Sequence, residues 1–301
     1  MVVVDGNEAL ISVLAHPRFE LIPIKGVEEQ ASYLPAGATV TVTCSPVRGI
    51  EHTLLHAEQL ALQGFRAVPH ISARLVRDTA HLRDILQRLH QLKPREIFVI
   101  GGDAKQPAGP FSGALDLLRA MAELGHNLDR IGVAAYPEHH PLIDDETLRR
   151  ALADKQQFAT YMVTQICFDP DAIVAWLADA RQRGITLPVY IGLPGVVDTV
   201  QLLRISMKIG VSTAARFASK HAGLATRLLR PGHYQPTELV ERLAPYFDDP
   251  WYNIQGLHLN TFNQAKSTEQ WRRQMPASVR SEPPWRGDRS DRDLDGARSS
   301  L

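Results

Sequence analysis

The chain has 301 residues, 33 Lys and Arg against 33 Asp and Glu, and 44% hydrophobic residues, which are ordinary proportions for a globular protein. This balance excludes a disordered chain, and the zero net charge argues against a nucleic-acid-binding protein, which needs a basic field. No apolar run is long enough to predict a membrane span, and the N-terminus has no secretory pattern. Two cysteines, Cys44 and Cys167, are too few for a disulfide scaffold, so we expect a cytoplasmic protein.

Eight short apolar runs rich in β-branched residues predict strands along the chain. They are residues 18–25, 39–45, 66–72, 96–103, 130–137, 161–169, 188–194 and 255–263. Between most of them apolar residues recur every three or four positions, as at Leu82, Ile85 and Leu89, which predicts amphipathic helices. Only the first connection is short and weakly helical. The segment 206–250 is long for one connection, so we expect two or three helices there.

Eight alternations of strand and helix within this length predict an α/β fold of the (β/α)8 barrel type, as a single domain over residues 1–276. An open doubly wound sheet is the alternative, and it is less favoured because no Gly-x-Gly-x-x-Gly motif follows the first strand. From residue 277 onward charged residues, Pro, Gly and Ser dominate, which predicts a disordered tail over 277–301.

Polar side chains at the C-terminal ends of the predicted strands are the candidate site residues, because barrels of this kind carry their chemistry there. The candidates are Glu20, His70 and Gln165 within predicted strands, and Thr43, Ser45, Asp103, Tyr136, Glu138, His139, His140, Asn260, Thr261 and Asn263 at strand ends. Adjacent histidines point in different directions and no His-Glu-x-x-His spacing is present, so we expect no metal site.

Three of these candidates carry a specific physical reason. Glu20 lies in an apolar strand, where desolvation would raise the pKa of its carboxyl and suit a general acid, unless the side chain turns outward to solvent. Asp103 follows two glycines, which let a ligand approach the backbone, although a turn or a helix cap would use the same residues. The Gln165 amide needs hydrogen-bond partners if buried, and either a bound heterocycle or a structural network inside the barrel could supply them.

Several short motifs occur in order between residues 18 and 264. They are Phe19-Glu20, Val42-Thr43, Pro69-His70, Gly102-Asp103, the string from Val133 through Tyr136-Pro137-Glu138 to His140-Pro141, Lys155, Thr164-Gln165 with Phe168-Asp169, and the string from His258 to Asn263. With these motifs the chain resembles the 5,10-methylenetetrahydrofolate reductase family.

The resemblance implies a (β/α)8 barrel in which NADH or NADPH delivers a hydride, through bound FAD, to 5,10-methylenetetrahydrofolate. The product is 5-methyltetrahydrofolate. It implies that Glu20 is the catalytic acid that assists opening of the five-membered ring, that Asp103 lies near flavin and folate, and that Gln165 contacts the pterin. Asn263 is expected on the folate side as well. The remaining matches imply a flavin pocket formed by Thr43, His70, Gly102, Asp103, Tyr136, His140 and Lys155.

The sequence departs from the family mostly around the expected flavin. Cys44-Ser45-Pro46 stands where the family has Tyr-Gly-Ala, and Gly101 and Gln264 stand where it has arginines. Losing an arginine removes a bidentate phosphate donor, whereas Glu20 and Gln165 are retained. We therefore hypothesise that FAD binding is weaker than usual or absent, and that without FAD the nicotinamide passes its hydride directly to the folate.

Two other functions remain open from the sequence. One is a pterin-dependent one-carbon transferase without hydride transfer, and the other is a folate-binding or regulatory relative without redox activity. The sequence predicts neither the oligomeric state nor the choice between NADH and NADPH.

Overall fold

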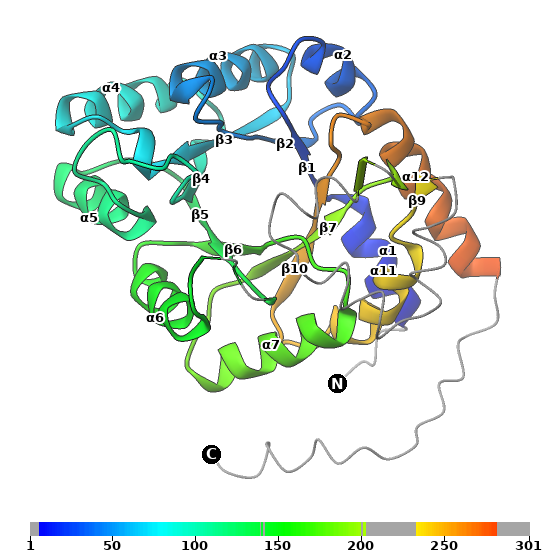
Figure 1. The fold of residues 1–301 in the computed structure, drawn as a ribbon. Helices are drawn as coiled ribbons and strands as arrows, with labels where there is room; N and C mark the ends of the chain where they lie inside the picture. The colour runs from blue at the N-terminus through cyan, green and yellow to red at the C-terminus, as the bar shows by residue number, and fades with distance from the viewer. Residues whose placement is uncertain (1–5, 139, 141, 200, 203–232, 282–301) are drawn as a thin grey trace.

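The computed structural model describes residues 6–138, 140, 142–199, 201–202 and 233–281 (Figure 1). Eight parallel strands close into a barrel in the order β1-β10-β7-β6-β5-β4-β3-β2. Their bounds are β1 Arg18–Leu21, β2 Thr39–Val42, β3 Arg66–Ser72, β4 Glu96–Ile100, β5 Arg130–Ala135, β6 Tyr161–Thr164, β7 Val189–Pro194 and β10 Ile254–Asn260. The closed ring confirms the predicted (β/α)8 barrel and excludes the open doubly wound sheet.

Helices surround the ring of strands (Figure 1). They are α1 Gly6–Ala15, α2 Val27–Ser32, α3 Gly49–Leu62, α4 Thr79–Leu89, α5 Ala114–Leu124, α6 Asp145–Gln156, α7 Pro170–Gln182, α11 Thr237–Leu243 and α12 Ala265–Ser281. Short 3₁₀ turns follow β3 (η1, Ala73–Leu75) and α11 (η2, Ala244–Tyr246), and β8 (Val197–Asp198) pairs antiparallel with β9 (His233–Tyr234). No helix within the described ranges is long and apolar enough to cross a membrane.

Local sequence signals explain where individual helices begin. The Asp78 carboxylate accepts the backbone N–H of His81 at the start of α4. The Asp169 carboxylate accepts two backbone N–H groups at the start of α7, where Pro170 takes the first position. Both arrangements satisfy N–H groups that the helix itself leaves without partners.

The barrel has an outer and an inner core, which is why its strands are apolar on both faces. The outer core lies between strands and helices and includes Leu54, Ile97 and Leu177. The inner core lies inside the ring and contains Val68, Phe98, Tyr161 and Val163. Burial on both faces removes the alternation of polar and apolar residues, as expected for parallel sheets.

A buried cluster of charges closes the end of the barrel where the strands begin. An Arg18 Nη2 atom lies 2.8 Å from Glu96 Oε1 and donates to the Tyr161 hydroxyl at 2.9 Å. Arg130 lies 3.7 Å from the other Glu96 oxygen and donates to the Tyr190 hydroxyl at 3.2 Å. We call Arg18, Glu96, Arg130, Tyr161 and Tyr190 the barrel floor. It leaves the opposite end, where the strands terminate, for a site.

The observed boundaries differ from the predicted ones at the ends of most strands. The sixth strand, for example, ends at Thr164, five residues before the predicted end, although Ile166 and Cys167 beyond it are buried. Apolar residues continue past the last hydrogen bond between strands because the loop residues that follow are buried too. Composition alone therefore places the strand ends too late. Six of the eight predicted strands, this one included, run past the observed end.

Two predictions fall partly or wholly outside the described residues. Helix α12 continues to Ser281, five residues beyond the domain boundary expected at residue 276. Residues 282–301 lie outside the described part, so the disordered tail stays a prediction. Much of the segment 206–250 also lies outside it, and of the helices predicted there the structure describes α11 and η2.

Candidate active site

Glu20 and two buried histidines meet inside the barrel above its floor. The Glu20 carboxylate comes from β1, His70 from β3 and His258 from β10. The His258 Nε2 atom lies 3.1 Å from Glu20 Oε2, within hydrogen-bond distance, and His70 Nε2 lies 3.8 Å from the same oxygen. The side chain of Glu20 is 20% exposed, whereas those of the histidines are 6% and 3% exposed. The carboxylate is therefore the member of this group that a ligand can reach.

The electrostatics of Glu20 differ from the sequence-based expectation. Burial raises the pKa of its carboxyl, but the His258 hydrogen bond and the electrostatic attraction of the His70 and His258 imidazoles lower it by more. The net pKa lies below the ordinary value, so the predicted raised pKa is wrong. The apolar neighbours in β1 were visible in the sequence, whereas the histidines 50 and 238 positions away were not.

His70 is held in its neutral form. Burial lowers the pKa of its imidazole to about 4; Glu20 opposes that shift, and His258 and Arg18 reinforce it. The sequence assigned His70 to the flavin pocket through the resemblance. In the structure its Nε2 atom points toward Glu20, and its ring packs against Phe98 with centroids 4.8 Å apart.

A second group of predicted residues lies at the ends of β4 and β5. The rings of Tyr136 and His140 meet nearly edge to face, with centroids 5.3 Å apart. Burial raises the pKa of Tyr136 and lowers that of His140, and the nearby charge of Asp103 acts upward on both. The structure thus brings Asp103, Tyr136 and His140 together, as the flavin-pocket prediction required, while their role in binding stays a prediction.

Gly102 has a backbone that only glycine adopts without strain. Its φ is +93°, and a Cβ atom there would lie 1.8 Å from Ser72 Oγ. Its neighbour Gly101 has no atom within 4 Å of the corresponding position. The glycine lets the loop after β4 press against the end of β3, and this places Asp103 beside Tyr136 and His140.

Gln165 and Thr43 follow directly after β6 and β2, on the same side of the barrel. The Gln165 side-chain oxygen accepts the N–H of Ile166 at 2.9 Å, which orients its amide plane. Thr43 donates its N–H to Leu21, and its carbonyl accepts the Thr53 hydroxyl at 3.0 Å. Each lies one position beyond the last strand residue, so Thr43 is at a strand end as predicted, whereas the sequence predicts Gln165 inside the sixth strand.

Asn263 does not offer its side chain to a substrate in this structure. Its Oδ1 accepts the N–H of Ile22 at 2.8 Å, and its Nδ2 donates to the carbonyl of Ile22 at 2.9 Å. Both ends of the amide therefore hold the loop after β1, two residues beyond Glu20. The substrate-binding role remains untested; the geometry gives Asn263 a supporting role for the strand that carries Glu20.

Lys155 lies apart from the other predicted residues. Its side chain is buried, its Nζ donates to the carbonyl of Ala134 at 3.1 Å, and burial lowers the pKa of its amine to about 8. It lines a cavity of about 520 Å³ between α6, α7 and the end of β5. Of the predicted site residues that the structure describes, only Tyr136 and Lys155 line this cavity.

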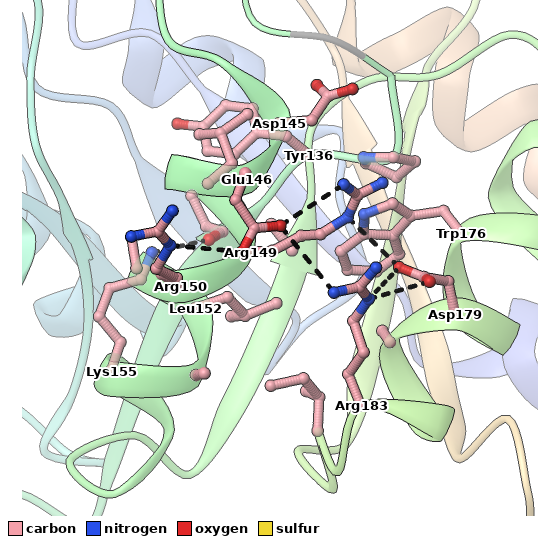
Figure 2. A pocket seen from close by; sticks show the side chains of 18 of the residues that line it. Tyr136, Asp145, Glu146, Arg149, Arg150, Leu152, Lys155, Trp176, Asp179 and Arg183 are labelled. Atoms are coloured by element: carbon pink, nitrogen blue, oxygen red, sulfur yellow. Dashed lines mark hydrogen bonds and ion pairs between the residues drawn. The ribbon is translucent and has the colours of Figure 1, made fainter.

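Charged side chains at this cavity are paired with one another, as Figure 2 shows. Arg149 and Arg183 lie 3.4 Å and 2.9 Å from the Asp179 carboxylate, and each lies 4.0 Å from Glu146. Because these arginines already have carboxylate partners, the cavity offers a ligand little free positive charge. We therefore take the group around Glu20, and not this cavity, as the candidate site.

The described residues fit the ring of a flavin better than its diphosphate. Gly102, Asp103, Tyr136 and His140 form an edge against which a flat heterocycle could lie. Cations are lacking where the resemblance expects them: Gly101 replaces an arginine, and the Lys155 amine is bound to Ala134. Arg74, which contacts the same loop, donates to the carbonyls of Ala104, Lys105 and Ser112. These residues do not fit tightly held FAD.

His258 is the site residue that the sequence-based prediction missed. In the sequence this residue stands out only as part of a family motif. A signal was present, because His258 and Asn260 alternate with Leu257 and Leu259 in the last strand, so both face the inside of the ring. Among the described residues no cluster of three or more His, Cys, Asp or Glu side chains is arranged to hold a metal ion.

The chain forms a closed (β/α)8 barrel whose ionisable groups gather inside the ring and at the C-terminal ends of the strands. This arrangement defines the class of barrel proteins that carry their chemistry at the C-terminal ends of the strands. Residues 25–275 match the family described as Methylenetetrahydrofolate reductase. The chain therefore belongs to the methylenetetrahydrofolate reductase family, which confirms the resemblance.

Curated relatives agree with this assignment at modest identity. Methylenetetrahydrofolate reductase 1 of Schizosaccharomyces pombe is 28% identical over 140 residues, covering 44% of this chain and 23% of the relative. Methylenetetrahydrofolate reductase 2 of Saccharomyces cerevisiae is 24% identical over 197 residues, covering 61% and 32%. Methylenetetrahydrofolate reductase (NADH) 1 of Zea mays is 31% identical over 178 residues, covering 54% and 29%. The matches thus span about a quarter to a third of these relatives.

Proposed function

We propose that the protein is an oxidoreductase of one-carbon metabolism that reduces 5,10-methylenetetrahydrofolate to 5-methyltetrahydrofolate with NADH or NADPH. The observation that carries this proposal is the Glu20 carboxylate inside the barrel, hydrogen-bonded to His258, at the position that the resemblance assigns to the family's acid. Family membership supports the substrate class, and relatives named for NADH and for NADPH leave both nucleotides as candidates.

In the proposed reaction, Glu20 takes up a proton when the folate binds and donates it to the folate nitrogen that leaves when the five-membered ring opens. The carbon–nitrogen bond breaks, its electron pair stays on that nitrogen, and an iminium carbon remains. Hydride from the nicotinamide then adds to this carbon. We assign binding of the pterin edge to Gln165, since an amide supplies both a donor and an acceptor. Holding acid, pterin and hydride donor in one opening makes the step effectively intramolecular.

We further propose that the hydride passes directly from the nicotinamide to the folate. Bound FAD would relay the hydride, but the missing arginines and the engaged Lys155 amine argue against a tightly held diphosphate. The edge formed by Gly102, Asp103, Tyr136 and His140 could then receive the nicotinamide ring. An absorbance spectrum of protein purified without added flavin tests this: a stoichiometric flavin band would overturn direct transfer.

The overall proposal is tested by following NAD(P)H oxidation with and without methylenetetrahydrofolate. Oxidation that depends on the folate, with 5-methyltetrahydrofolate as product, supports a reductase. Folate binding without oxidation would instead indicate a binding protein, and methyl transfer without a nicotinamide would indicate a transferase. A cytoplasmic location remains our expectation from the two free cysteines.

A further inference from the structure

We propose that Arg74 is the residue that positions Asp103, because its side chain and backbone together hold the loop between β4 and α5 in place. We call residues 101–113 the β4–α5 loop. The effect of this clamp on nucleotide binding rests on the proposed function, whereas its effect on the position of Asp103 does not.

All three nitrogens of the Arg74 guanidinium donate to carbonyls of the β4–α5 loop. Nε lies 2.6 Å from the Ala104 oxygen, Nη2 lies 2.7 Å from that of Lys105, and Nη1 lies 3.0 Å from that of Ser112. The first two carbonyls follow Asp103 directly, and the third lies near the far end of the loop. One planar, three-pronged side chain therefore ties the two ends of the loop together.

The backbone of Arg74 contacts the same loop. Its N–H donates to the carbonyl of Gly101 at 3.0 Å, and its own carbonyl accepts the N–H of Ala108 at 2.9 Å. Gly109 comes so close to the chain after η1 that a Cβ atom there would overlap the carbonyl oxygen of Arg77. The middle of the loop thus packs against this chain with no room for a side chain.

Asp103 lies between two of the points that Arg74 holds. The backbone of Arg74 bonds the residue two positions before Asp103, and its guanidinium bonds the residue directly after it. Asp103 is itself exposed, so packing does little to fix its carboxylate, yet its charge acts on Tyr136 and His140. The place of this carboxylate therefore depends on the backbone that Arg74 holds.

On the proposed function, the clamp keeps the edge that receives the nicotinamide ring formed in advance. Without the Arg74 side chain, the loop would have to become ordered when the nucleotide binds, and such ordering costs binding free energy. The cost falls on binding and not on the chemical step, because the bound loop reaches the same arrangement. The KM for the nucleotide should therefore rise while kcat changes little.

The test is the titration of His140 in the ligand-free protein, followed by NMR of its imidazole, with His140→Gln to identify the resonance. Asp103 raises the pKa of His140 against the effect of burial, so Asp103→Asn should lower the midpoint and sets the full size of the effect. Arg74→Met should lower the midpoint by part of that amount, and should add nothing in an Asp103→Asn background. Arg77→Met removes an exposed arginine that pairs with Glu51, and should leave the midpoint unchanged.

The sign of the shift separates movement of the loop from loss of a charge. Removing the positive charge of Arg74 would by itself favour protonation of His140 and raise its pKa. A lower midpoint in Arg74→Met therefore reports that the Asp103 carboxylate has moved away. Arg74→Lys keeps the charge and can still reach some of the carbonyls, so it should restore the midpoint in part.

Gly109→Ala tests the same clamp without changing any charge. The added methyl group pushes the loop away from the Arg77 carbonyl, so the His140 midpoint should fall as it does in Arg74→Met. A midpoint at or above the wild-type value in either variant would overturn the inference. If Arg74→Met fails to fold, Gly109→Ala decides.

Kinetics test the consequence for the nucleotide. Arg74→Met should raise the KM for the nucleotide by about tenfold, which corresponds to the cost of ordering one or two flexible side chains. A fall in kcat at unchanged KM would overturn the link to nucleotide binding. The His140 titration needs no turnover, so a wild-type protein without reductase activity would remove the proposed function and leave the titration to decide on Arg74.

Discussion

Glu20 and His258 are 238 positions apart in sequence and meet at 3.1 Å where the first and last strands of the barrel pair. The pairing register sets Arg18 opposite His258 and Glu20 opposite Asn260. Because the side chains of alternate residues face the same side of a sheet, this register places Glu20 and His258 on the inside together. The candidate acid and its hydrogen-bond donor therefore come together only when the barrel closes.

The first prediction concerns the acid itself. Glu20→Gln should bind the folate but lose about 10²-fold or more in kcat, because general acid catalysis contributes roughly that much. Folate binding by calorimetry and NAD(P)H oxidation by absorbance separate the two effects. Glu29→Gln, in helix α2 outside the site, is the matched control. Wild-type turnover by Glu20→Gln would remove the acid role.

Glycine is required at position 102 but not at position 101. Gly102→Ala should destabilise the protein by about 2 kcal/mol or more, since alanine meets both a strained φ and Ser72. Gly101→Ala should change stability by less than about 0.5 kcal/mol, because its Cβ would enter open space. Urea unfolding measures both. Adding Ser72→Ala to Gly102→Ala should recover part of the loss, and equal losses at the two glycines would contradict this account.

Asn263 should support the Glu20 strand through the loop after β1. Asn263→Ala removes both hydrogen bonds to Ile22 and puts alanine at a φ of +58°, so stability should fall by about 2 kcal/mol. Asn263→Gly tolerates that φ and should lose less. Hydrogen exchange should be faster at Ile22 in both variants. Unchanged exchange together with a raised KM for folate would instead support the substrate-binding role.

The buried neutral His70 should make stability depend on pH. Its pKa is about 4 in the folded protein and about 6.5 when unfolded, so between these values the unfolded chain binds the extra proton. Stability should therefore fall as the pH drops from 6.5 toward 4, by at most about 3 kcal/mol from this residue. Urea midpoints should fall less steeply over this range in His70→Gln than in the wild type. Parallel curves for the two proteins would refute the assignment.

Removing the central charge of the barrel floor should be costly. Glu96→Gln leaves Arg18 buried without its carboxylate partner, and breaking a buried pair in this way destabilises by roughly 3–5 kcal/mol. Glu58→Gln breaks the partly exposed pair with Arg88 and should have a much smaller effect. Thermal unfolding of both variants compares them. A similar small effect at both sites would mean that the floor contributes little to stability.

The sequence predicted the parts of this molecule that depend on local pattern. Apolar runs identified all eight strands. A strand-end position singled out Asp103 and Tyr136 as candidates, and a polar side chain inside an apolar strand singled out Glu20 and Gln165. Contacts across the ring could not be read in the same way, because they depend on register and closure. For this reason three features appear only in the structure. They are the His258 hydrogen bond, the direction of the Glu20 pKa shift and the hydrogen bonds between Asn263 and Ile22.

The barrel floor of Arg18, Glu96, Arg130, Tyr161 and Tyr190 has a consequence for how ligands reach the site. These side chains fill the end of the barrel where the strands begin. On the proposed function, the folate and the nicotinamide nucleotide would therefore enter and leave by the opposite end, and the molecule bound deeper in the barrel would leave last.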